Sequence, residues 1–146
     1  LYYNMFYFNG KKRVTKEILN KLKPLGMEVW FCDDGYYNYR GNHIEIATFN
    51  FNFSEHQIIK KWFIKKWNIH FKIMKDNSRT SQHKYFLRLG ATETKKFIQL
   101  IKPYVIKSMI YKIGLDKKRK KLAIKNSKVY VKVYYKKIKI RYKNIK

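Results

Sequence analysis

The ten residues from Gly26 to Gly35 constrain the fold of this 146-residue chain more than any other segment. They read Gly-Met-Glu-Val-Trp-Phe-Cys-Asp-Asp-Gly, an apolar helical stretch that ends in two adjacent carboxylates and a glycine. Pro24 suits the first turn of a helix and Gly35 stops it, so we expect a helix from Pro24 to Asp34. Only nine acidic residues stand against 35 Lys and Arg, so two neighbouring acids are a candidate site for a hard metal ion held against a nucleic-acid phosphate.

The formal net charge of +26 indicates a polyanionic partner, and nucleic acid is the commonest one. An anionic membrane surface is the rival, but the sequence shows no long basic amphipathic helix and no apolar run of about 18 residues, so we expect no membrane partner. Lys, Asn, Ile, Phe and Tyr make up 80 of 146 residues, and all have A/T-rich codons. A biased genome can supply part of the lysine excess, so the positions of the charges are more informative than their sum.

Cys32 is the only cysteine, which excludes an intrachain disulfide and a cysteine-cluster zinc site and fits a reducing compartment. The chain opens on Leu1 without a signal-peptide pattern, so we expect a processed chain or a piece of a longer one. The expected location is intracellular, in an A/T-rich organelle such as a mitochondrion or in a bacterial cytoplasm.

Turn and capping signals predict the elements that follow. Asn9-Gly10 predicts an early turn, and residues 36–51 alternate around Gly41-Asn42 as in a hairpin. Two overlapping capping signals, Asn52 with Glu55 and Ser54 with Gln57, open a helix to about Trp67, with Ile58, Ile59, Trp62 and Phe63 on its apolar side. Further along we expect a strand at 69–75, a loop at 76–82, a strand at 83–89, a helix opened by Thr92 or Thr94 and broken by Pro103, and a short segment carrying Met109 to Lys112.

This order predicts an α+β fold, with four strands in one antiparallel sheet and helices on one face. On the last two strands, the apolar residues share one alternation phase and the basic residues share the other. The basic set is the candidate DNA-binding face, with solvated lysines on an ordinary sheet as the alternative: His70, Lys72, Lys84 and Arg88.

The helical wheel divides residues 25–34 into two sides. Trp30, Met27 and Phe31 form a bulky side that can enter the core. A smaller side allows a second helix to approach closely, and it consists of Gly26, Val29, Cys32 and Asp33. Asp34 would then lie at the bottom of a helix pair, where two carboxylates and phosphate oxygens can hold magnesium. A solvated Asp pair is the alternative, although acids at a helix C-terminus are unfavourable by about 0.3–1 kcal/mol.

Residues 115–146 have a different composition, with 14 Lys and Arg and the single acid Asp116. We therefore divide the chain into a domain at 1–114, which contains the motif helix 24–35, and a basic Lys-rich tail at 115–146. The tail includes the basic run Lys117 to Lys121 and a loosely alternating stretch at 129–142. It is either a nucleic-acid or nuclear-import-like patch or a segment without packed structure, and we favour the second.

The motif helix resembles the second motif of the LAGLIDADG homing endonucleases, in the intron-encoded subgroup with a proline-led helix ending Trp-Phe-x-Asp-Asp-Gly. This chain has Lys23-Pro24-Leu25 and then Trp30-Phe31-Cys32-Asp33-Asp34-Gly35. Two further matches follow in order: Ile46-Ala47-Thr48 before a capped helix, and Leu100-Ile101-Lys102-Pro103-Tyr104-Val105-Ile106 leading to Ser108-Met109-Ile110-Tyr111-Lys112. The resemblance covers about residues 6–114.

The resemblance implies a half-domain of order helix-β-β-helix-β-β-helix, whose saddle-shaped sheet lies in the major groove of double-stranded DNA. It implies a nuclease that hydrolyses phosphodiester bonds with Mg²⁺ or Mn²⁺. At the matching positions, Asp34 would bind the catalytic metal and Gly35 would offer backbone at the same site. Lys112 would be the catalytic cation that stabilises phosphate charge or polarises water.

Two departures from the family pattern affect the expected site. Ala47-Thr48-Phe49 stands where family members often carry Asn-Thr-Gln, which puts water positioning and a base contact in doubt. Glu28 replaces a small residue, so it either strains the helix pair or meets a Lys or Arg across it. Only one motif is present, so the chain resembles the second half of a two-motif enzyme. A companion half or a homodimer would complete it.

Two other functions are compatible with the sequence. An RNA-binding intron maturase, a splicing helper with intron RNA as partner, would keep the basic face without requiring Asp34. A degenerate fragment would bind DNA weakly and cut nothing.

Overall fold

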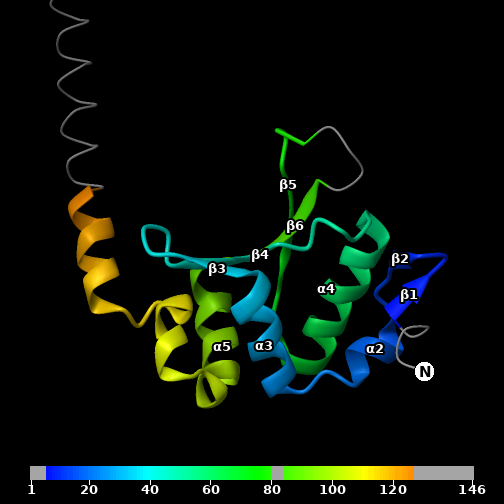
Figure 1. Ribbon diagram of the computed structural model, residues 1–146, viewed down its shortest axis with the longest axis horizontal. Coiled ribbons are helices and arrows are strands. Elements are labelled where there is room, and N and C mark those ends of the chain that lie inside the picture. The colour runs from blue at the N-terminus through cyan, green and yellow to red at the C-terminus, as the bar shows by residue number, and fades with distance from the viewer. Residues whose placement is uncertain (1–5, 80–83, 127–146) are drawn as a thin grey trace, which may run out of the picture.

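The computed structural model describes residues 6–79 and 84–126 (Figure 1). The predicted order of helix, two strands, helix, two strands and helix is confirmed by the elements from α3 to η2, where η marks a 3-10 helix. In chain order the elements are β1 (Tyr7–Phe8), β2 (Lys11–Lys12), α2 (Lys16–Asn20), α3 (Pro24–Asp34), β3 (Gly35–Asn38), β4 (His43–Ile46), α4 (Phe53–Trp67), β5 (Lys72–Lys75), β6 (Tyr85–Leu89), α5 (Ala91–Ile101), η1 (Lys102–Tyr104) and η2 (Lys107–Ile113).

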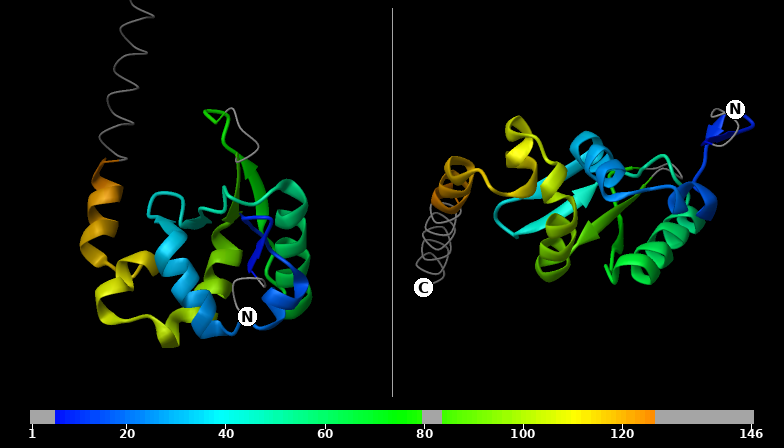
Figure 2. Two further views of the ribbon diagram at one scale, coloured as in Figure 1. Left: turned by 45° about the vertical axis from the view of Figure 1, so that its right-hand side comes forward. Right: turned by 90° about the horizontal axis from the view of Figure 1, so that it is seen from below.

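The four longer strands form one antiparallel sheet in the order β3-β4-β6-β5. Glu45 of β4 pairs with Tyr36 of β3 on one side and with Arg88 of β6 on the other, and Arg88 pairs with Lys72 of β5. Helices α3, α4 and α5 lie together on one face of this sheet, and no described element covers the other face (Figures 1 and 2). The predicted α+β architecture is therefore confirmed.

The core lies between the sheet and this helix layer. On the two central strands, Ile44 and Ile46 of β4 and Leu87 and Leu89 of β6 are fully buried in the core. Aromatic rings meet edge to face at 5.5 Å between Phe31 and Phe97 and at 4.8 Å between Phe63 and Phe71. The fully buried large side chains are Met27, Phe31, Ile44, Ile46, Ile59, Phe63, Ile69, Phe71, Leu87, Leu89, Phe97 and Ile101.

Helix α3 has the bounds that Pro24 and Gly35 predicted. Pro24 occupies the first turn, where its missing N–H costs no hydrogen bond. Gly35 is required at the other end by a close approach, because an added Cβ would lie 2.2 Å from Cδ2 and 2.3 Å from the carbonyl oxygen of Phe31. The helix therefore passes directly into β3 without a connecting loop.

The β1–β2 hairpin confirms the turn predicted from Asn9-Gly10. Both residues have positive φ, 49° and 71°, as the tight turns of two-residue hairpins require. The second predicted hairpin is also present, because β3 and β4 flank the turn at Gly41-Asn42.

Helix α4 begins with the first of the two predicted caps. The Asn52 side chain accepts from the backbone N–H of Glu55, while the Glu55 carboxylate accepts from the backbone N–H of Asn52. The predicted apolar side was wrong at Ile58, which is 36% exposed. The buried stripe passes through His56, Ile59, Trp62 and Phe63, and Ile58 lies to one side of it.

Two predicted boundaries in the second half were wrong. The strand predicted at 69–75 begins only at Lys72, although Ile69 and Phe71 are buried. The next helix begins at Ala91 after the N-cap Gly90, not at a threonine cap. Thr94 is buried one turn further on, where its hydroxyl accepts from the Ile44 N–H at 3.2 Å and donates to the Leu89 carbonyl at 3.3 Å.

Residues 117–126 are helical, and all of them except Ala123 are exposed, so the expected lack of packed structure in residues 115–146 stays a prediction. The Asp116 carboxylate accepts a hydrogen bond from the backbone N–H of Arg119. The Arg119 guanidinium lies 4.2 Å from the ring centroid of Tyr111. This helix stands beside the turn between β3 and β4 (Figure 1). The strand-like stretch at 129–142 lies outside the described residues.

Within the described part of the chain, no helix combines the length and apolar character that crossing a membrane requires.

Candidate functional site

Asp33 and Asp34 end α3 beside the open face of the sheet, and both are exposed. The backbone carbonyl of Asp34 accepts from the N–H of Ala47 at 2.9 Å, so strand pairing holds the end of α3 against β4. The last turn of α3 contains no basic residue. The carboxylates therefore add negative charge at the negative end of the helix dipole, and a cation from another element has to compensate.

Lys112 of η2 supplies a cation at this helix end. Its ammonium group donates to the backbone carbonyl of Gly35 at 2.7 Å. The N–H of Gly35 donates to the Phe31 carbonyl, so both backbone groups of Gly35 are engaged. Two residues that lie 77 positions apart are thereby joined next to Asp34, as their places in the sequence motifs had suggested.

A groove of about 430 Å³ opens beside Asp34 on the outer side of the sheet. Its walls come from strands β3 to β6 and from the loops after β4 and β5, and they include Tyr36, Glu45, Phe49 and Lys75. Exposed aromatic and basic groups thus adjoin the carboxylate at the end of α3.

The donor set fits one half of a magnesium site. Mg²⁺ is commonly held by one or two carboxylates together with substrate phosphates and water. Asp34 supplies one exposed carboxylate, and residues 6–79 and 84–126 contain no group of three or more His, Cys, Asp and Glu that could hold a metal ion. Further oxygen ligands would come from water, from the nucleic acid and from a second chain.

The side of α3 predicted to meet another helix is only partly covered by the described residues. Val29 is 58% exposed and Asp33 is exposed, while Gly26 and Cys32 are half-buried. Leu25 is 53% exposed and extends the same apolar surface. On the opposite side, Met27 and Phe31 enter the core as predicted, and the third bulky residue, Trp30, is half-buried.

Glu28 has a partner that the sequence did not reveal. Its side chain is only 6% exposed, and it accepts a hydrogen bond at 3.0 Å from the Cys32 thiol one turn later. Burial, followed by this hydrogen bond, raises the pKa of Cys32 to about 12. The thiol therefore stays protonated and serves Glu28 as a donor.

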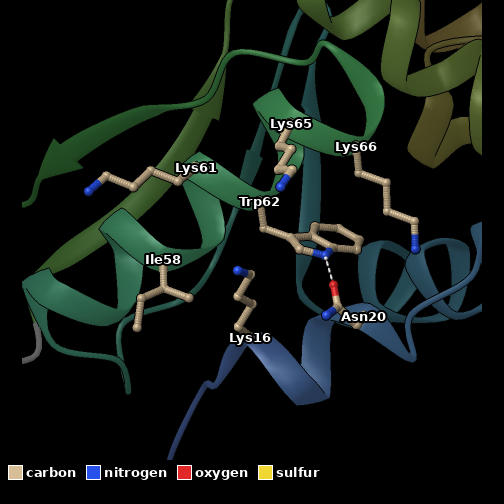
Figure 3. A pocket seen from close by; sticks show the side chains of 7 residues that line it. All are labelled: Lys16, Asn20, Ile58, Lys61, Trp62, Lys65 and Lys66. Carbon is tan, nitrogen blue, oxygen red and sulfur yellow. Dashed lines mark hydrogen bonds between the residues drawn. The ribbon is translucent and has the colours of Figure 1, made fainter.

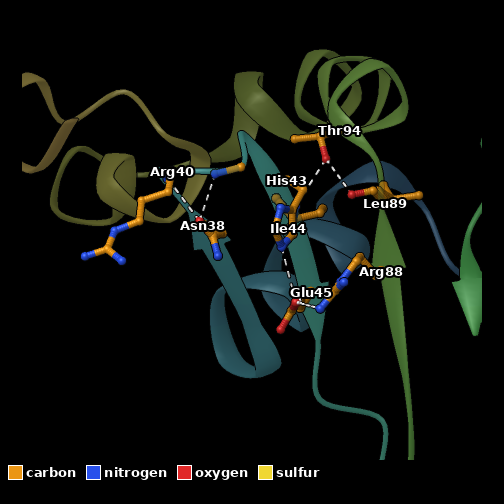
Figure 4. A network of polar contacts seen from close by, with 9 residues as sticks. Asn38, Arg40, His43, Ile44, Glu45, Arg88, Leu89 and Thr94 are labelled. Atoms are coloured by element: carbon orange, nitrogen blue, oxygen red, sulfur yellow. Dashed lines mark hydrogen bonds and ion pairs between the residues drawn. The ribbon is translucent and has the colours of Figure 1, made fainter. Parts of the chain in front are cut away.

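Glu45 lies at the centre of the open sheet face, where the sequence had indicated only basic residues. Arg88 on the next strand contacts its carboxylate through Nη2 at 2.6 Å and Nε at 2.8 Å (Figure 4). His43 Nε2 lies 3.2 Å from the same oxygen. Arg88 is therefore on the predicted face but is paired within the protein.

The other three predicted face residues have different surroundings. Lys72 is exposed on β5, directly opposite Arg88. Lys84 precedes β6 and continues the alternation phase of Phe86 and Arg88. His70 is exposed and lies before β5, where its backbone N–H donates to Glu93 of α5 and its ring contacts the Asn68 amide.

The loop after β4, which carries Ala47-Thr48-Phe49, is fixed from below by a buried histidine. Nε2 of His56 lies 2.8 Å from the Thr48 hydroxyl, and Nδ1 lies 2.7 Å from the Asn52 carbonyl. Burial lowers the pKa of His56, so the neutral ring donates from Nδ1 and accepts from Thr48. Above the loop, the Arg79 guanidinium lies 3.8 Å from the centroid of the Phe49 ring.

Sequence reasoning had not included Glu45 or His56 in the site. Glu45 alternates with the buried Ile44 and Ile46, so its outward direction could have been inferred. Its pairing with Arg88 could not, because that contact depends on the register of strands 43 residues apart.

Comparison with known proteins supports the resemblance to the LAGLIDADG family for most of the chain. A family model described as the LAGLIDADG DNA endonuclease family matches residues 1–97. The chain is 31% identical over 109 residues to cytochrome b mRNA maturase bI2 of Debaryomyces hansenii, a match that covers 75% of the chain and 40% of the relative. It is 27% identical over 113 residues to probable intron-encoded DNA endonuclease 3 of Mycosarcoma maydis, covering 73% and 79%. It is 31% identical over 114 residues to intron-encoded endonuclease ai4 of Dictyostelium discoideum, covering 77% and 69%.

A solved structure shares the fold. The homing endonuclease I-WcaI, solved bound to its DNA recognition sequence, has a TM-score of 0.66 and 24% sequence identity. The likeness covers 75% of this chain and 49% of that chain. The chain therefore spans about half of the solved enzyme and 40% of the yeast maturase.

Proposed function

Because the chain belongs to the LAGLIDADG DNA endonuclease family, we propose that it is one half of a site-specific homing endonuclease that hydrolyses phosphodiester bonds of double-stranded DNA with Mg²⁺ or Mn²⁺. The observation that carries this proposal is the exposed Asp34 carboxylate at the end of α3, which lines the groove of about 430 Å³ on the outer side of the sheet. The next residue, Gly35, accepts a hydrogen bond from the Lys112 ammonium on its backbone carbonyl.

Each site residue has a distinct role in this proposal. Asp34 holds the divalent ion, which when bound supplies Lewis-acid stabilisation of phosphate charge. Gly35 brings the end of the helix into contact with β3, and its carbonyl positions the Lys112 ammonium. Lys112 lies within reach of the reacting phosphate, where a cation offsets the negative charge that develops there.

DNA would lie on the open sheet face. Lys72 and Lys84 supply ammonium groups for phosphates. Arg88 is paired with Glu45, so it either breaks this ion pair or binds DNA together with Glu45. His70 would contact DNA only at the border of this face, because its neighbours are Asn68 and Glu93. The exposed Tyr36 and half-buried Phe86 and Met74 give this face apolar groups for base edges.

A second half would complete the enzyme. The partly covered side of α3 offers Gly26, Val29, Cys32 and Asp33 to a partner helix, and one Asp34 per chain cannot cut both strands. The partner is a companion half or a second copy of this chain, and we favour the companion.

Nicking of a supercoiled plasmid library with a randomised insert tests the proposed chemistry. In Mg²⁺, the assembled wild-type chain nicks a subset of inserts, Asp34→Asn does not, and both bind DNA with near-equal affinity because binding rests on basic side chains. Glu17→Gln, which neutralises an exposed carboxylate on α2, is the matched control and keeps nicking. Nicking by Asp34→Asn at the wild-type rate would contradict the metal assignment, and inert wild-type protein would point to a degenerate fragment.

A second candidate function is that of an RNA-binding maturase, which the relative named as a cytochrome b mRNA maturase favours. In that case intron RNA is a partner, and Asp34→Asn leaves RNA binding intact. Because relatives are named as intron-encoded, either function would be exercised in an organelle or cell that carries such introns, and we favour a mitochondrion.

A further inference from the structure

A pocket of about 810 Å³ lies between α2 and α4 (Figure 3). It is separate from the groove at Asp34, because α4 packs beneath the sheet and α2 lies on the far side of α4 (Figure 1). The pocket is lined by Lys16, Asn20, Ile58, Lys61, Trp62, Lys65 and Lys66.

The polar groups that line this pocket are hydrogen-bond donors. Four of the seven lining residues are lysines, and an ammonium group has no acceptor capacity. The carbonyl oxygen of Asn20 accepts the indole N–H of Trp62 at 2.9 Å, which leaves the amide NH₂ of Asn20 for a ligand. A ligand must therefore bring acceptors, and four positive charges favour an anion with several negative groups.

The spacing of the lysines suits an extended polyanion. Lys61 and Lys65 lie one turn apart on α4, which separates them by about 6 Å along the helix. Lys16 comes from the opposite wall, and its side chain points toward the space around Trp62 (Figure 3). A polyanion that spans both walls would contact lysines from α2 and from α4.

The floor of the pocket is apolar. It is lined by Ile58, which is 36% exposed, and by the largely buried Trp62. The Lys66 ammonium lies 5.0 Å from the Trp62 ring centroid and 5.6 Å from the Trp67 ring centroid. A ligand that combines repeated anionic groups with flat apolar parts matches both features.

We propose that this pocket binds single-stranded RNA, with phosphates at Lys16, Lys61 and Lys65 and a base against Ile58 and Trp62. A duplex keeps its bases stacked inside and cannot place one on the floor. An acidic peptide would bring N–H donors to a pocket whose polar groups are themselves donors. The choice of RNA over single-stranded DNA rests on the maturase alternative proposed above, whereas the anion-binding geometry is independent of it.

Fluorescence anisotropy with a labelled oligouridylate of about 12 nucleotides tests the proposal on the full chain. The triple variant Lys16→Gln, Lys61→Gln, Lys65→Gln loses three phosphate contacts, so the slope of log K against log salt falls in magnitude by about two. The matched control Lys95→Gln, Lys102→Gln, Lys107→Gln removes three exposed lysines elsewhere, and its slope stays near that of the wild type. In a Trp30→Phe, Trp67→Phe background, RNA also changes the remaining Trp62 fluorescence.

Three outcomes would overturn the proposal. The control triple could weaken RNA binding as much as the pocket triple, oligodeoxythymidylate or a glutamate-rich peptide could bind as tightly, or duplex DNA could displace the RNA. Asp34→Asn leaves oligouridylate binding unchanged and the pocket triple keeps plasmid nicking, so failure here is distinguishable from failure of the endonuclease assignment. Retained nicking also shows that the triple variant folds.

Discussion

Gly35 is the residue at which packing leaves the least freedom. A Cβ at this position would overlap both the ring and the backbone carbonyl of Phe31. We expect Gly35→Ala to lower the free energy of unfolding by about 1–3 kcal/mol or to prevent folding, because a backbone atom cannot move aside. Urea denaturation followed by circular dichroism measures this.

Gly26→Ala is the control for that prediction. An added Cβ there meets only the flexible Cδ1 of Leu22, at 3.0 Å. Alanine is favoured over glycine inside a helix by about 1 kcal/mol, so the unfolding free energy should stay level or rise. Equal stability of Gly35→Ala and the wild type would contradict the close approach at the end of α3.

His56 links folding stability to pH. Burial lowers its pKa below the ordinary value of 6.5, so the unfolded chain binds the proton more readily than the folded one. The contribution is fully present above pH 6.5 and is lost as the pH falls from there toward the lowered pKa. Protonation also puts a donor where Nε2 accepts from Thr48.

The pH dependence is measured by urea unfolding at about pH 7.5 and about pH 5. We expect the wild type to lose more unfolding free energy over this interval than His56→Gln, which has no group titrating in this range at that position. The same loss in both proteins would assign the acid sensitivity to other groups.

Among single residues, the family resemblance placed three at one site, and their roles stay predictions. Asp34, Gly35 and Lys112 are adjacent in the structure, as the motifs suggested. Glu28 and Glu45 were not understood, since the partner of Glu28 depends on burial and that of Glu45 depends on strand register.

At the scale of elements, boundaries set by neighbouring residues were predicted better than boundaries set by contacts between distant segments. The bounds of α3 and the first cap of α4 are local, and both were predicted correctly. The start of β5 was misplaced because alternation reports burial, and Ile69 and Phe71 are buried by packing outside the strand ladder. Similarly, Thr94 was predicted as a possible helix cap because threonine can cap helices, but its hydroxyl accepts a hydrogen bond from the Ile44 N–H of β4 instead.

The helix at 117–126 leads to a prediction about the basic tail. Its described anchors are few, including the contact of Arg119 with the Tyr111 ring. Residues 117–146 contain 14 of the 35 Lys and Arg residues. Removing them should leave the thermal midpoint nearly unchanged while lowering non-specific DNA affinity and the salt dependence of binding.

Thermal unfolding and anisotropy with a random duplex, each at several salt concentrations, provide the measurement. A large drop in the thermal midpoint would show that the domain extends past residue 114. Unchanged salt dependence would show that the tail charges do not reach DNA.

At the scale of the whole molecule, the layout has two consequences for assembly. The helix layer covers one face of the sheet and leaves the other open, while the side of α3 at Val29 has no described partner (Figures 1 and 2). Each chain has one Asp34, whereas a double-strand break needs two cuts. We therefore expect the isolated monomer to be unable to linearise plasmid DNA, and assembly through α3 to be required.

Val29→Asp tests this assembly, because it places charge on the exposed α3 surface. The side chain is 58% exposed, so the unfolding free energy should change by no more than about 0.5 kcal/mol. Light scattering, with and without DNA, should show loss of the assembled species, and plasmid linearisation should disappear with it. Ile106→Asp, at a residue 61% exposed on the segment before η2, makes the same chemical change elsewhere and should preserve both. A strictly monomeric wild-type chain that makes double-strand breaks would refute the requirement for a second α3.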